Sequence, residues 1–208
     1  MGLFTKRQRP FTVRYEAKSS EGGLDQVLTM ANHTEVDVVP VLRYRPLDFY
    51  GRELPLVSVT TIQGTSRGQV IVPAGLEVRD LLRFEGPGCR SVRFVDTEVL
   101  ELVEAEPTGV DKVPVTVMVD LDKQATRDAE NFWGIGVQNQ TDAEMRVRVT
   151  LVELEERHGD NPRQPVDWVS LEGDVVLEPQ SHDVVWLPEG VRGRYHDVLG
   201  AVAAPPLA

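Results

Sequence analysis

The chain has 208 residues, of which 41% are hydrophobic and 26% are charged, and its formal net charge is −11 at pH 7. This length accommodates one large β domain or two domains of roughly 100 residues each, and the composition is that of a globular protein. Residues 1–104 hold 13 basic and 14 acidic side chains, whereas residues 105–208 hold 9 and 19. This acidic balance argues against general nucleic-acid binding, because a phosphate backbone recruits clustered Lys and Arg.

The first nine residues form a basic arm before the first expected strand. No acidic residue interrupts Lys6, Arg7, Arg9 and Arg14. The apolar stretch that precedes them is too short for the apolar region of a secretory signal, and no later run reaches the length of a membrane span. We therefore expect a cytoplasmic protein, or one exported without a conventional signal, for example in a virion-like assembly.

An Asn-x-Thr-acid tetrapeptide opens an alternating apolar run at two places, NHTEVDVVPV from Asn32 and NQTDAEMRV from Asn139. This alternation predicts two strands that each bury one face. The expected inward residues are Val36, Val38, Pro40, Leu42 and Tyr44 in the first strand, and Ala143, Met145, Val147, Val149 and Leu151 in the second. Asp37 falls on the expected outer face. Pro40 donates no ladder hydrogen bond, so we expect an edge or a bulge there.

Both Asn-x-Thr tripeptides also match the glycosylation acceptor pattern, although no export signal supports that use. A structural explanation requires less, since Asn can hydrogen-bond the nearby backbone while Thr begins the strand.

Further short strands are predicted between turn signals such as YGRE, EGPG and HGDNP. They cover residues 57–62, 70–72, 78–84, 99–103, 168–171, 175–177 and 184–187. Residues 123–131 are the best candidate for a short helix or a polar excursion.

Four blocks recur in the same order in the two halves, and each is expected to form a strand. PFTVRY matches PVTVMV, the two Asn-x-Thr blocks follow, GQVIVPAG matches GDVVLEPQ, and RFVD matches RYHD. Loop insertions explain the small drift in spacing. We interpret the pattern as an internal duplication with these parts: a basic arm at 1–9, a first domain at 10–104, a linker at 105–111 and a second domain at 112–208.

About seven short strands in roughly 100 residues are typical of an antiparallel β-sandwich. The Asn-x-Thr opening of an alternating strand, a Gly-containing turn and the later VPAG or LEPQ turn resemble bacterial immunoglobulin-like and fibronectin-type modules, over most of each half. The resemblance implies an all-β fold of two tandem antiparallel β-sandwich domains. The Cys-Trp-Cys core of antibody domains is missing, which excludes that narrower family.

The titratable residues form no complete catalytic or metal-binding pattern. None of the histidines has HExxH or His-x-His spacing: His33, His158, His182 and His196. The acidic segment from Asp120 lacks the Gly and Glu of a calcium loop. Cys89 is the only cysteine, which excludes an intrachain disulfide, and no base for a cysteine nucleophile can be defined beside it. We therefore predict a protein that is not an enzyme and that has no cofactor and no metal.

The leading hypothesis is a non-enzymatic structural or protein-interaction protein, part of a larger assembly and bound to a protein partner or to itself. The candidate interaction residues are Lys6, Arg7, Arg9, Arg14 and Trp133. The basic arm of one subunit would bind the acidic second domain of the next. A solvated arm explains the same residues.

Two alternatives stay open. Trp133 in NFWG is the best candidate for a carbohydrate-binding platform, whereas Trp168 and Trp186 fall in apolar strand patterns and are expected in the core. An acidic cleft between the domains would instead serve an enzyme or a metal-binding protein.

Overall fold

The computed structural model describes residues 9–18, 24–63, 67–68, 70–128, 131–156, 161–171, 175–191, 195 and 197–202. The strands are β1 (Phe11–Lys18), β2 (Asp25–Asn32), β3 (Val38–Leu47), β4 (Ser58–Thr61), β5 (Glu77–Glu85), β6 (Phe94–Glu104), β7 (Val115–Val119), β8 (Gly134–Gln138), β9 (Met145–Leu154), β10 (Pro165–Ser170), β11 (Val175–Leu177), β12 (His182–Trp186) and β13 (Asp197–Val202). Two short 3₁₀ turns, η1 (Cys89–Ser91) and η3 (Glu189–Val191), complete the described elements. The predicted all-β class is confirmed. Within these residues no helix is long and apolar enough to cross a membrane.

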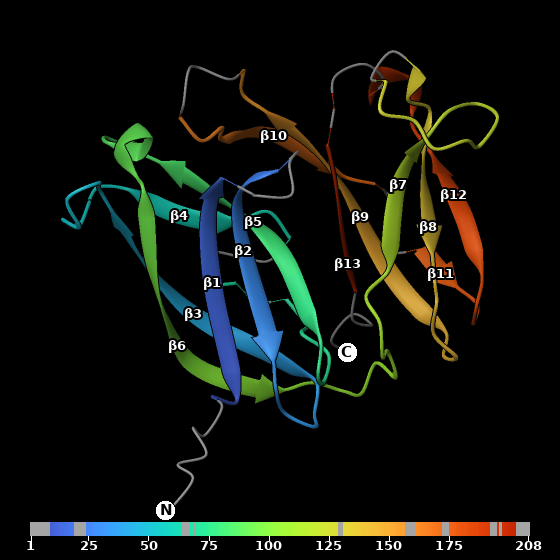
Figure 1. The fold of residues 1–208 in the computed structure, drawn as a ribbon, viewed down its shortest axis with the longest axis horizontal. Helices are drawn as coiled ribbons and strands as arrows, with labels where there is room; N and C mark the ends of the chain where they lie inside the picture. Colours follow the sequence, from blue (N-terminus) through green and yellow to red (C-terminus); the bar gives the residue numbers. More distant parts are fainter. Residues whose placement is uncertain are drawn as a thin grey trace, which may run out of the picture.

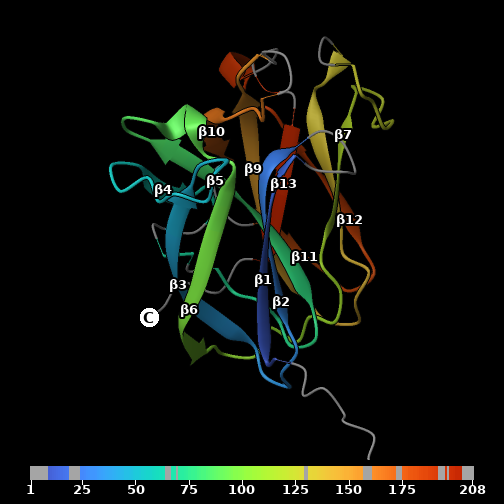
Figure 2. The same ribbon diagram turned by 60° about the vertical axis from the view of Figure 1, so that its left-hand side comes forward.

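The strands form several antiparallel sheets, which Figures 1 and 2 show as two groups. The first half of the chain holds the sheet β1-β2-β5-β4 and the ribbon β3-β6. The second half holds the sheet β12-β8-β7 and the sheet β10-β9-β11, and β13 also pairs with β9. The described residues of 123–131 form turns and a β-bridge at Ala125 in place of the short helix considered from the sequence.

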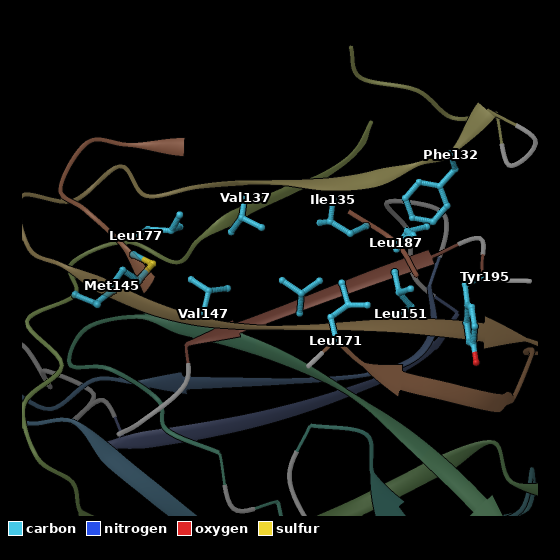
Figure 3. Close-up of a cluster of buried hydrophobic side chains, with 12 residues drawn as sticks. Phe132, Ile135, Val137, Met145, Val147, Leu151, Leu171, Leu177, Leu187 and Tyr195 are labelled. Carbon is cyan, nitrogen blue, oxygen red and sulfur yellow. The ribbon is translucent and has the colours of Figure 1, made fainter. Parts of the chain in front are cut away.

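Each half has its own buried hydrophobic cluster. In the first half, side chains of β2 and β5 meet Leu42 of β3. In the second half, Ile135 and Val137 of β8 point toward Val147 and Leu151 of β9 (Figure 3). Every predicted inward residue of β9 from its start at Met145 to Leu151 is buried, because the strand alternates as expected. Each cluster thus joins strands of two different sheets.

The prediction for β3 is confirmed in its core and wrong at its start. Val38 and Leu42 are buried, whereas Val36 precedes the strand and is 42% exposed. The pairing of β3 with β6 shifts between Val41 and Leu42, so the bulge expected near Pro40 is present.

Asn32 ties the start of β3 to a neighbouring segment. Its Nδ2 donates to the carbonyl oxygens of Val36 at 2.8 Å and Val72 at 2.9 Å. Its Oδ1 accepts from both the backbone N–H and the hydroxyl of Thr34. Because Asn32 is 1% exposed, these bonds replace all contact of its amide with water.

Asn139 makes the same set of bonds in the second half. Its Nδ2 donates to Ala143 at 2.8 Å and to Leu177 at 3.3 Å, and its Oδ1 accepts twice from Thr141. The two Asn-x-Thr segments therefore share one local structure, that of a polar turn which closes a strand onto its neighbour.

The strand β7 presents the opposite face from the one that its sequence block suggests. Matching PFTVRY to PVTVMV places Val115 and Val117 in the core. They are instead 46% and 41% exposed, and Met118 packs on the core. A shift of one residue exchanges the two faces of a strand, and here it turns Val115 and Val117 outward and Met118 inward. The outer face of β7 is consequently apolar.

A third hydrophobic cluster joins the two halves. Val27 of β2 and Leu81 of β5, on the outer face of the first sheet, pack with Val152 of β9, and Trp168 of β10 lies against them. The guanidinium of Arg83 stacks over the Trp168 ring at 4.8 Å. In Figure 1, β9 and β13 accordingly lie beside β5. The outer face of β2 and β5 around Val27 and Leu81 is thus covered by the second half.

The segment between β6 and β7 is anchored on both sides. Asp37 Oδ2 accepts from the N–H and the hydroxyl of Thr108, each at 2.7 Å, and Val110 is buried in the core of the second half. Asp37 was expected on an outer, solvated face. That expectation is wrong, since the carboxylate is 8% exposed beneath this segment.

Replacing Asp37 with Ala removes the acceptor of the two bonds from Thr108 and of a third from the Ala74 N–H. Because buried donors without a partner are costly, we expect Asp37→Ala to lower the free energy of unfolding by about 3 kcal/mol. Urea unfolding measures this change. Glu35→Ala, an exposed neighbour, is the control and should have an effect of about 0.5 kcal/mol or less. Equal stability of the two variants would contradict the anchoring role.

Candidate protein-interaction site

The loop between β3 and β4 presents the three most exposed large apolar side chains of the described residues. Tyr50 is 78% exposed, Phe49 is 72% exposed and Leu56 is 70% exposed. The rings of Phe49 and Tyr50 form an edge-to-face pair with centroids 5.6 Å apart. Adjacent exposed aromatic rings on one loop mark an interaction surface, because their burial by a partner removes a large apolar area from water.

Asp48 holds residues 48–52, here called the aromatic loop, in one conformation. Its Oδ1 accepts from the N–H groups of Tyr50 at 2.8 Å and Arg52 at 3.0 Å, and its Oδ2 accepts from Arg52 Nε at 2.8 Å. Gly51 has a φ of 75°, which glycine adopts without strain. The backbone closes between Asp48 and Arg52 with an N–H···O bond of 2.9 Å. The two rings are therefore displayed on an ordered turn.

Arg52 adds charge to this surface. Its guanidinium lies 5.1 Å from the centroid of the Tyr50 ring and forms an ion pair with Asp48. The backbone N–H of Arg52, together with its guanidinium and the N–H of Tyr50, holds the pKa of Asp48 below its usual value, against the opposing effect of partial burial. Tyr, Phe and Arg side by side are the residue types enriched at the centres of protein interfaces.

The rest of the loop is fixed against the connection between β5 and β6. Gly86 has a φ of 100°, and a Cβ there would lie 2.4 Å from the Leu56 carbonyl oxygen. Only glycine fits this approach. Val57 and Leu54 follow the aromatic loop into the first hydrophobic cluster. The loop thus has a rigid base beneath its exposed tip.

A second candidate surface is a groove on the outer face of β7-β8-β12, with a volume of about 420 Å³. It is here called the apolar groove after the valines that line it, although Lys123, Gln138, His182 and Asp183 also border it. Gly134 and Gly136 of β8 leave its floor without side chains, and Val117 of β7 and Val184 of β12 form its sides. A Cβ at Gly136 would lie 3.1 Å from Val117 Cγ1, so larger residues would crowd the floor. Trp186 lies at the end of β12 beside Gly134.

The structure places only part of the basic arm. Lys6 and Arg7 lie outside the described residues. Arg9 is exposed and borders an open groove of about 820 Å³ between β1 and β6, which Arg43 and Arg45 also line. Arg14 forms an ion pair with Glu16 at 3.0 Å. The groove is not uniformly basic, because Arg43 pairs with Glu98 and Arg45 with Asp96.

Two of the three tryptophans differ from the sequence expectation. Trp133, predicted as an exposed platform, is half-buried, and its backbone N–H donates to the Val119 carbonyl. Trp168 lies in the contact between the halves. The prediction that Trp186 belongs to the core is wrong, because the alternation of β12 turns Val185 inward and leaves Trp186 45% exposed.

The acidic segment from Asp120 uses its carboxylate to close a turn. Asp120 Oδ1 accepts from the N–H groups of Asp122 at 2.9 Å and Gln124 at 2.8 Å. In the described part of the chain, no three His, Cys, Asp or Glu side chains are grouped so that they could hold a metal ion. Cys89 is half-buried in η1 against the first hydrophobic cluster.

The histidines of the described residues likewise belong to no group that could hold a metal ion. His33 shares a 3.2 Å hydrogen bond with Thr12, His182 is exposed on β12, and His158 and His196 fall outside the described residues.

The described crevice between the halves is small and of mixed charge. Arg90 and Arg93 of the first half face Glu155 and Glu156 of the second across a volume of about 40 Å³. This space is close to that of a single water molecule. This crevice therefore differs from the acidic cleft between the domains that the second alternative proposes.

No protein-family model and no curated protein matches the chain. The candidate interaction residues proposed from the sequence include neither the aromatic loop nor the apolar groove. A signal for the loop exists in LDFYGRE, where an Asp three residues before a Gly predicts a tight turn and therefore exposure of the two rings between them.

Acid should loosen the aromatic loop. Since the folded-state pKa of Asp48 is below its unfolded value, its carboxylate stabilises the loop above the unfolded pKa, and this stabilisation is lost as the pH falls through the folded pKa. Amide chemical shifts of Tyr50 and Arg52 in a pH titration measure the change. Asp48→Asn keeps an acceptor but not the charge and should abolish the transition. A midpoint at or above the usual Asp value would contradict this assignment.

Proposed function

We propose that the protein is a non-enzymatic structural or interaction protein, built of two β-sandwich domains related by internal duplication, and that the aromatic loop is its contact with a protein partner. The observation that carries this proposal is the exposed pair of Phe49 and Tyr50 on a loop ordered by Asp48.

The duplication has three structural supports. The Asn-x-Thr segments make matching hydrogen bonds, and each half has one cluster between two sheets. The pairing registers also correspond. Val38 bridges to Val72 in the first half, and Met145 pairs with Leu177 at the matching positions of the second. Two modules of one ancestry that retain their cores are expected to differ mainly on their surfaces.

The contact energy of the aromatic loop is sufficient for specific binding. An aromatic side chain buries on the order of 150 Å² or more, so covering each ring contributes about 3 kcal/mol. An ordered loop also loses little conformational entropy when it binds. Phe49 and Tyr50 therefore have the properties of binding hot spots.

A carbohydrate-binding role is the second candidate, and one observation favours it. The exposed ring of Trp186 lies on the same face of β12 as Val184, near the polar residues His182 and Asp183. A sugar ring would stack on Trp186 in this candidate, not on the half-buried Trp133. Titration of Trp fluorescence with soluble oligosaccharides tests it, and an unchanged emission spectrum removes it.

Substituting both rings tests the protein-binding proposal. A tagged full-length chain is used to recover partners from the native source, and the amount of each stoichiometric partner is measured by mass spectrometry. Phe49→Ser with Tyr50→Ser should reduce recovery by about tenfold or more. The thermal unfolding midpoint should stay unchanged, because both rings are exposed.

The matched control is Val166→Ser with Val176→Ser, two valines that are 46% and 50% exposed on the second half. The control variant should recover as much partner as the unsubstituted chain. Equal recovery by the Phe49 and Tyr50 variant would show that the aromatic loop is not the contact.

A further inference from the structure

We propose that copies of this chain associate head to tail, with the outer face of β3-β6 and the aromatic loop of one copy seated on the outer face of β7-β8-β12 of the next. The inference rests on the proposed function, because it extends the contact between the two duplicated halves to a contact between copies.

The contact within the chain is the template. The first half offers the outer face of β1-β2-β5, where Val27 pairs with Leu81. The second half covers this pair with Val152 of β9 and leaves Val27 5% exposed and Leu81 0% exposed. One half therefore supplies a sheet face and the other half supplies the strand that covers it.

The corresponding face of the second half has no cover within the described residues. The positions of Val27 and Leu81 correspond in register to Gly134 and Trp186, which pair in the same way. Trp186 is 45% exposed where Leu81 is fully buried. The position of Arg14 in β1, opposite Thr29, corresponds to Val117 in β7, opposite Gly136.

This face is thus more apolar than its counterpart and yet more exposed. Exposed valines and a tryptophan add no stability to a sheet face that stays in water. They add stability when a partner covers that face.

In the first half, the strand that corresponds to β9 is β3, and its outer face is also uncovered within the described residues. Val152 of β9 pairs with Asp197, and Arg45 of β3 pairs with Asp96 at the matching position. The outer face of β3-β6 therefore corresponds in register to the face of β9 that packs on the first half, and it carries the Arg43–Glu98 and Arg45–Asp96 ion pairs where β9 carries Val152. Within the described residues it is exposed, and it ends at the pair of Leu47 and Phe94, of which Phe94 is 53% exposed.

The aromatic loop continues this face beyond Leu47. Within the chain, Leu154 at the end of β9 packs near Leu24, which lies in the connection between β1 and β2. The same contact between copies directs Leu47 and the aromatic loop toward the connection between β7 and β8. Leu121 in that connection is 58% exposed. Apolar groups thus oppose one another at this end of the contact.

Charge favours this pairing over a symmetric one. The half that supplies the aromatic loop is nearly neutral, whereas the half that supplies the groove carries 19 acidic and 9 basic residues. Two grooves facing each other would bring two strongly acidic halves together, which is unfavourable. A contact between two different faces leaves one of each unused, and it therefore propagates into a chain or a ring of copies.

Sedimentation velocity of full-length variants, alone and mixed, tests the inference. The head variant is Phe49→Ser with Tyr50→Ser, and the tail variant is Val117→Arg, which places the charge of Arg14 in the groove. The unsubstituted chain should form a concentration-dependent series of oligomers, and each variant alone should associate about tenfold more weakly or not at all. An equimolar mixture should form dimers, since it restores one intact head and one intact tail.

Two further variants serve as a control for the added charge and as a replacement for the tail variant. Val176→Arg places the same charge at an equally exposed valine of β11 and should leave the oligomers unchanged. Val115→Lys is a second tail variant for the case in which circular dichroism shows that Val117→Arg is unfolded.

A monomeric unsubstituted chain at all concentrations would overturn the inference, as would a mixture of the two variants that stays monomeric. A monomeric chain whose head variant still loses a different protein partner would overturn self-association and leave the proposed function intact. Binding of a sugar to the groove without any oligomer would likewise overturn it.

Discussion

Burial of the outer face of β2 and β5 against β9 is the contact on which the arrangement of the molecule depends. Val27 and Leu81 are removed from water by Val152, and Asp25 accepts from the backbone N–H of Arg163 at 2.8 Å at the margin of the same contact. Together with the anchored segment around Thr108, this contact orients the two halves relative to each other. Each half is small, so apolar area buried between them adds stability that neither core supplies alone.

Burial on one face or on both faces determines which strands could be predicted from the sequence. The strands β3 and β9 follow an alternating pattern, and their inward residues were identified correctly from Val38 and Met145 onward, whereas Val36 before β3 is exposed. The strand β2 was missed because it is buried on both faces, which removes the alternation. The strand β8 was missed because Gly134 and Gly136 stand where outward residues would reveal it. The interior strands β2 and β8 were therefore the hardest to find.

The candidate site was harder to predict than the fold for a related reason. Apolar residues indicate burial in a sequence pattern, so LDFYGRELPL resembles buried strand and turn more than an exposed surface. Exposure of Phe49 and Tyr50 follows from the local bonds of Asp48 and from the position of Gly51, a turn signal that the surrounding apolar residues obscure. The one-residue shift of β7 hid the apolar groove in the same way. The basic arm was conspicuous in the sequence, yet Arg14 pairs with Glu16 in the fold. The groove that Arg9 borders also holds the ion pairs of Arg43 and Arg45 with acidic partners.

Two surfaces, one on each half of the chain, are proposed to meet between copies: the exposed rings of the aromatic loop and the groove on β7-β8-β12, which is floored by glycine. Hydroxyl-radical footprinting over a range of protein concentrations tests this claim most directly, since it reports side-chain exposure at each surface separately. The account predicts that Phe49, Tyr50 and Trp186 lose reactivity together as the concentration rises, while the half-buried Trp133 keeps a constant reactivity. Protection of Tyr50 without Trp186, or constant reactivity of all three side chains, would contradict it.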